Sequence, residues 1–141
     1  MRLKVISATL IMFLSFPLVL AQQKKRKNRA PCSKAMTQLA LNACFCDRAQ
    51  KADVQLNDIY QQLLKKNASD TNYIDKLRIS ERAWVAFRDA QLEALYPDPD
   101  PKAAYGSMFT MCECMAREEL TMDRVKQLRR MLKSVEGDVC D

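Results

Sequence analysis

The segments ADVQLNDIY (residues 52–60) and SERAWVAFRDA (residues 80–90) decide the fold of this chain. In both, apolar residues recur every three or four positions, which is the spacing of one face of an α-helix. Each face also carries a charge, because Asp53 is in line with Leu56 and Tyr60, and Arg88 follows Trp84 by four residues. A single buried charge is costly, so an acid and a base on the inner faces of successive helices predict a buried, structural Asp53–Arg88 pair.

The same spacing along the rest of the chain predicts an all-α fold, a small bundle of three long helices crosslinked by disulfides. We expect helices at about residues 37–66, at about 72–96 and from Gly106 onward, with Thr37 as the first N-cap and Ser107 as the last. Three prolines at 97, 99 and 101 end the second helix. The predicted inner faces comprise Leu39, Ala43, Cys46, Ala49, Asp53, Leu56, Tyr60 and Leu63; then Tyr73, Leu77, Ser80, Trp84, Phe87, Gln91 and Ala94; and finally Met108, Met111, Met115, Met122, Val125, Leu128, Leu132 and Val135.

The beginning of the chain predicts export. Arg2 and Lys4 precede an apolar run, and Val19-Leu20-Ala21 suits cleavage before Gln22, so residues 1–21 are interpreted as a signal peptide. The run is shorter than the roughly 20 residues that a membrane span needs, and Pro17 interrupts it. We therefore expect a periplasmic or secreted protein without stable membrane insertion, in which a basic flexible linker (residues 22–31) precedes the helical domain (residues 32–141).

Positive charge is concentrated in the linker. The chain has 23 basic and 17 acidic residues, but from Ala30 onward the two nearly balance. Since the sequence has neither a second basic patch nor interleaved aromatic residues, we expect no nucleic-acid partner. The linker is interpreted as a solvated segment, and the alternative is a weak contact with anionic lipid or polysaccharide. Its basic residues are Lys24, Lys25, Arg26, Lys27 and Arg29.

The residue types present argue against an enzyme. The chain has no histidine, which removes Ser-His and Cys-His nucleophilic pairs and the usual zinc ligands, and it has no Gly-rich phosphate loop. We expect no cofactor.

Six cysteines in an exported chain predict up to three disulfides. Two C-x-C pairs occur, and positions two apart on a helix point about 200° away from each other, so one cysteine of each pair can face a neighbouring helix. Cys32 is expected to reach Cys44, and Cys46 to reach Cys112 or Cys114, which leaves the other for Cys140. The disulfide candidates are thus Cys32, Cys44, Cys46, Cys112, Cys114 and Cys140.

The segments at residues 52–60 and 80–90, in this order, resemble the N-terminal domain of the LprI-type lysozyme inhibitors, a family of small, helical, cysteine-containing envelope domains. The resemblance covers Cys32 to about Leu132. Leu92 stands where the family usually has a cysteine, and extra cysteines are present, so the bridge pattern of the family is not carried over. The matching motif positions beyond the Asp53–Arg88 pair are Asn57, Tyr60, Trp84, Asp89, Thr121 and Arg124.

The resemblance implies a binding module that inhibits lysozyme and protects the cell wall, with a lysozyme or another cell-wall hydrolase as its partner. The Pro-rich connection from Tyr96 to Tyr105 is the candidate contact, because it is expected to be stiff and extended and it carries Asp98 and Asp100. The alternative is a soft-metal, Cu(I), or redox-responsive envelope protein, because thiolates and thioethers select Cu(I). Its ligands would be Met108, Met111, Cys112, Cys114 and Met115.

Overall fold

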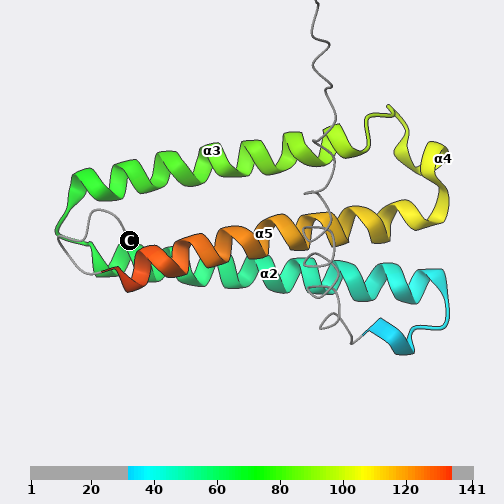
Figure 1. Cartoon of the computed structure of the whole chain (residues 1–141), viewed down its shortest axis with the longest axis horizontal. Coiled ribbons are helices and arrows are strands. Elements are labelled where there is room, and N and C mark those ends of the chain that lie inside the picture. Colours follow the sequence, from blue (N-terminus) through cyan, green and yellow to red (C-terminus); the bar gives the residue numbers. More distant parts are fainter. Residues whose placement is uncertain (1–31, 135–141) are drawn as a thin grey trace, which may run out of the picture. The chain divides into compact units, whose positions relative to one another are not determined.

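The computed structural model describes residues 32–134 and is all-α over that range (Figure 1). Three long helices are present, which confirms the expected fold class. The predicted signal peptide and linker, Val135 and Cys140 lie outside the described residues. The chain divides after Ser33, and all the long helices belong to the unit that begins at Lys34. The elements are η2 (Cys32–Lys34), α2 (Gln38–Lys66), α3 (Thr71–Leu95), α4 (Pro101–Tyr105), η3 (Gly106–Met108) and α5 (Phe109–Lys133).

Side-chain caps fix where the first two long helices begin. Thr37 accepts a hydrogen bond from the backbone N–H of Ala40 at 3.2 Å, as predicted, and Asp70 accepts one from Tyr73 at 2.9 Å. The N-cap predicted for the third long helix is wrong, because Ser107 lies within η3 and α5 begins only at Phe109. None of the described helices is long and apolar enough to cross a membrane.

The core lies between α2 and α5, which run parallel and pack along much of their length, while α3 returns antiparallel to both (Figure 1). Leu63, Val125 and Leu128 have no solvent exposure. Burying a side chain of this size contributes about 1.5–3 kcal/mol. The core cluster consists of Leu56, Ile59, Leu63, Leu77, Val125 and Leu128.

Helix α3 contributes little apolar burial to this core. Only Leu77 and Leu92 of its 25 residues are buried. Phe87, predicted to face inward, is 56% exposed, and Ala94 is exposed as well. After Trp84, the prediction took steps of three and four residues to Phe87, Gln91 and Ala94, which lie to one side of the inner face. The observed inner face runs through Leu77, Trp84, Arg88 and Leu92.

The predicted inner faces also fail at the ends of the other helices. Leu39 is 80% exposed and Met108 is 53% exposed. Leu39 lies in the first turn of α2 and Met108 precedes α5. The apolar spacing of the sequence therefore extends beyond the segments of these helices that neighbouring helices cover.

The connection after α3 is partly helical, which corrects the prediction of an extended segment. Pro101 occupies the first turn of α4, where its missing N–H is no loss. Asp100 caps this helix by accepting from Ala103, and Asp98 accepts from the N–H of Asp100 at 2.9 Å. Gly106 follows with φ +68°, a conformation that glycine adopts without strain.

Candidate functional site

Three motif residues from three helices meet at one carboxylate. Arg88 on α3 lies 3.4 Å from Asp53 Oδ1 on α2, and the hydroxyl of Thr121 on α5 donates to the same oxygen at 3.2 Å. The Arg88 guanidinium also lies over the Trp84 ring, 5.4 Å from its centroid, and bonds Asp89. The junction therefore joins all three long helices.

The Asp53–Arg88 pair forms as predicted, but it is not fully buried. The Arg88 side chain is 13% exposed, whereas that of Asp53 is 40% exposed. Water therefore solvates part of the Asp53 carboxylate. Arg88 is thus one of three partners of this carboxylate, together with water and the Thr121 hydroxyl. Because these polar groups bond one another within the junction, we interpret the junction as a structural contact that holds the three helices together.

Arg124 forms a second and better buried junction. Its Nε lies 2.8 Å from Glu81 Oε1, and its Nη2 lies 2.9 Å from the Ser80 hydroxyl. The two charged side chains are 11% and 13% exposed. Sequence reasoning identified Arg124 through its motif but missed Glu81, although Glu81 lies four residues after the buried Leu77 and three before Trp84.

The remaining motif positions divide between the core and the surface. Tyr60 and Trp84 pack against the core cluster. Asn57 and Asp89 are exposed. A further ion pair between Arg48 and Glu118 at 2.8 Å, which the sequence analysis did not identify, links α2 to α5.

Replacing Thr121 with Val should lower the free energy of unfolding by roughly 1 kcal/mol. Thr121 is completely buried and valine matches its shape, so the change removes little more than the hydroxyl that bonds Asp53. Urea denaturation followed by circular dichroism measures the change. Thr121→Ser keeps the hydroxyl but loses a methyl group; a valine variant as stable as the parent would contradict the role of the bond.

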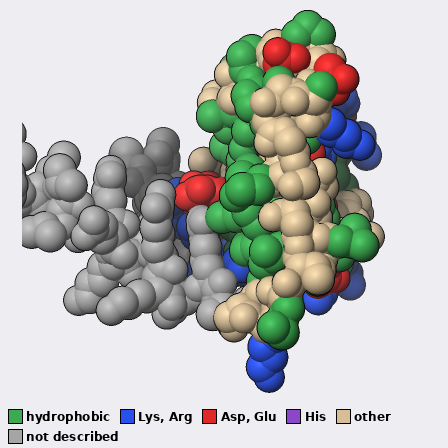
Figure 2. Space-filling view, turned by 90° about the vertical axis from the view of Figure 1, so that its right-hand side faces the viewer, with side chains coloured by type: hydrophobic (Ala, Val, Ile, Leu, Met, Phe, Trp, Pro, Cys, Tyr) green, Lys and Arg blue, Asp and Glu red, His purple; other side chains and the backbone are tan. Residues whose placement is uncertain are grey.

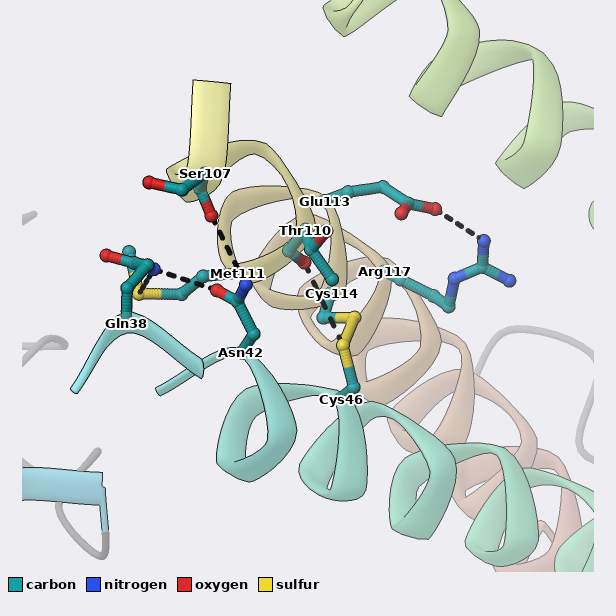
Figure 3. The surroundings of a disulfide bond; sticks show 9 residues. All are labelled: Gln38, Asn42, Cys46, Ser107, Thr110, Met111, Glu113, Cys114 and Arg117. Atoms are coloured by element: carbon teal, nitrogen blue, oxygen red, sulfur yellow. Dashed lines mark hydrogen bonds and ion pairs between the residues drawn. A yellow bond between two sulfur atoms is a disulfide. The ribbon is translucent and has the colours of Figure 1, made fainter. Parts of the chain in front are cut away.

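A disulfide near the N-terminal ends of α2 and α5 decides between the two partners predicted for Cys46, which were Cys112 and Cys114. Cys46 bonds Cys114, with a Cα–Cα distance of 4.9 Å (Figure 3). Next to this bridge, Asn42 donates from Nδ2 to the carbonyl oxygen of Ser107 at 3.2 Å, and this hydrogen bond links α2 to η3.

The other cysteines depart in part from the prediction of three bridges. Cys32 and Cys44 are both disulfide-bonded. Cys112 is a free thiol in the structure, so the prediction that it is bridged is not met, and Cys140 lies outside the described residues. Cys112 is two residues from Cys114 and therefore points away from α2.

The structure does not support the soft-metal alternative. Cys114 is oxidised and supplies no thiolate, which removes one of the five expected ligands. Met108 is half exposed, and Met111 accepts a weak hydrogen bond from Gln38 at 4.0 Å. Over residues 32–134, no three His, Cys, Asp or Glu side chains lie close enough together to hold a metal ion.

The end of the domain around α4, residues 95–109, presents apolar and acidic groups together; we call it the α4 end. Tyr96 packs edge-to-face on both Tyr105 and Phe109, at 5.7 and 5.2 Å between ring centroids. Leu95 and Tyr105 remain about half exposed. Seen end-on, the molecule has acidic groups near the top of the view and hydrophobic patches beside a central band of backbone and other polar atoms (Figure 2).

A pocket of about 270 Å³ opens beside the α4 end, between α3 and α5. Burial raises the pKa of the Tyr96 phenol, and electrostatic interactions with Cys112 and Glu113 raise this pKa further. The phenol thus stays protonated at neutral pH. The pocket is lined by Asp89, Leu92, Glu93, Tyr96, Pro101, Phe109, Glu113 and Arg117.

Comparison with known proteins places this chain in a family. The family model described as lysozyme inhibitor LprI matches residues 29–128. An uncharacterized protein, R02472, of Rhizobium meliloti (strain 1021) is 30% identical over 117 residues, covering 75% of this chain and 81% of its own length. No solved structure matches the chain. The family match covers α2, α3, α4, most of α5 and both polar junctions, so the chain belongs to the lysozyme inhibitor LprI family.

Proposed function

We propose that this protein binds a lysozyme and inhibits it at the cell wall, from a periplasmic or secreted location. The family match over residues 29–128 carries the proposal. The disulfides suit an oxidising compartment outside the cytoplasm. The partner is a lysozyme or another cell-wall hydrolase with the same kind of cleft.

The α4 end is the proposed contact surface. A lysozyme cleft holds two carboxyl groups, and an inhibitor must fill it or exclude substrate from it. Exposed aromatic and aliphatic side chains suit this role, because aromatic groups dominate the energy of protein interfaces. Leu95, Tyr105 and Met108 are about half exposed at this end, and two exposed aspartates there complement a basic target.

The direct test is a turbidity assay of cell-wall lysis by several classes of lysozyme, with and without the purified mature protein. Inhibition of at least one class at micromolar concentration supports the proposal. Removal of residues 22–31 should leave inhibition intact, since a cationic segment would be repelled by a cationic enzyme. If every class remains fully active, the family relationship extends to the fold and not to lysozyme.

Replacing Asp98 and Asp100 together with Asn should slow association with lysozyme several-fold and reduce its dependence on salt. Both carboxylates accept local backbone bonds, and an asparagine side chain keeps the acceptor oxygen. The substitution therefore removes charge while α4 remains capped. Association rates at low and high salt measure the effect, and a matched control is Asp47→Asn with Asp75→Asn, on exposed sites of α2 and α3.

A further inference from the structure

We propose that the pocket between α3 and α5 receives a basic side chain, arginine or lysine, from the lysozyme that this protein binds. The inference rests on the proposed function and names the recognition chemistry at that surface. The pocket's volume of about 270 Å³ lies just below the range of pockets that hold whole small molecules. It is therefore suited to one inserted side chain.

The walls of the pocket suit a cation. Tyr96 and Phe109 supply aromatic rings at 5.2 Å and nearly perpendicular to each other, and Leu92 supplies a buried apolar surface. The face of an aromatic ring attracts a cation, most strongly where water is excluded. An arginine also stacks on rings and uses its flat donor fork on a carboxylate.

One carboxylate of the pocket, that of Glu93, has no ion-pair partner among the described residues. Asp89 bonds Arg88 at 2.8 Å, and Glu113 bonds Arg117 at 2.7 Å. Among the described residues Glu93 makes neither an ion pair nor a side-chain hydrogen bond, and it is exposed. A cation that enters the pocket could thus bind the Glu93 carboxylate without breaking an existing ion pair.

The position of Glu93 does not serve helix stability. It lies in the last turn of α3, and that turn has no basic residue. The C-terminal end of a helix carries a partial negative charge, which disfavours a carboxylate there. An external cation would supply the partner that the helix end lacks.

The first test uses small probes and does not require lysozyme binding. N-acetylarginine amide, titrated into the full mature protein, should shift the backbone amide signals of Leu92, Glu93, Phe109 and Glu113 in a saturable way. N-acetylcitrulline amide is nearly the same shape but neutral, and it should leave these signals unchanged. Equal shifts with both probes, or no saturable shift with arginine, would overturn the proposal.

The second test uses lysozyme and a matched pair of variants. Glu93→Gln should weaken binding to an inhibited lysozyme roughly tenfold, mainly through faster dissociation. Asp58→Asn removes the same charge from an exposed site on α2 that lies outside the pocket, and it should change affinity less than about twofold. Phe109→Leu keeps an apolar wall without the ring and should weaken binding while Asp58→Asn does not.

The outcomes separate the two proposals. If the parent binds no lysozyme but arginine amide still shifts the pocket signals, the proposed function fails and the pocket chemistry stands. If the parent inhibits lysozyme and Glu93→Gln binds as tightly as Asp58→Asn, the pocket inference fails and the function stands.

Discussion

Replacing Cys46 and Cys114 together with Ala should lower the free energy of unfolding by about 4 kcal/mol. The bridge closes a loop over a sequence separation of 68 residues, and the loss of chain entropy that a crosslink imposes on the unfolded state grows with loop length. Urea denaturation in the absence of reductant measures the change, because a reductant would also open the disulfides of Cys32 and Cys44.

The matched control is Cys112→Ala, which removes a free thiol from the same stretch of α5. It should cost less than about 1 kcal/mol, since no covalent link is lost and the site is only half-buried. If the control destabilised the protein as much as the double variant, the bridge between α2 and α5 would not be the source of the effect.

The second large effect is expected at Arg124. Replacing it with Ala should lower the free energy of unfolding by roughly 3 kcal/mol, because Glu81 would lose its charge partner in a site where its side chain is only 13% exposed. Arg124→Lys restores the charge but not the two-nitrogen contact with Glu81, so it should recover only part of the loss. Chemical denaturation of the three proteins measures the order.

Arg88→Ala provides the comparison and should cost less, about 1–2 kcal/mol. Its partner Asp53 is 40% exposed and retains the hydrogen bond from Thr121. A larger loss at Arg88 than at Arg124 would contradict the view that burial of the remaining carboxylate sets the cost.

The sequence predicted one of the two polar junctions and most of the core cluster, but not the whole inner face of α3. Asp53 and Arg88 are paired as expected, because a charge on an inner face requires a partner, whereas the contacts of Thr121 with Asp53 and of Arg124 with Glu81 were not predicted. Phe87 was placed wrongly because α3 has few apolar contacts to define its inner face, and three-residue and four-residue steps fit the pattern equally well.

At the α4 end, prediction failed for a different reason. Three closely spaced prolines indicated an extended segment, but Asp100 and Pro101 together are a helix-starting signal, and they begin α4. The pocket was not predictable at all, since it depends on how α3 and α5 approach each other. Periodicity within one helix carries no information about that approach.

The bridge between α2 and α5 also determines what a protease can do to this molecule. Cys46 and Cys114 enclose α3, α4 and the exposed residues 97–100 within one covalent ring. Exposed connections of this kind are preferred sites of nicking. A single cut there opens the ring but releases no fragment, because the disulfide still joins the two parts of the chain. The helices of a nicked molecule therefore remain covalently linked, and can pack together, until the disulfide is reduced.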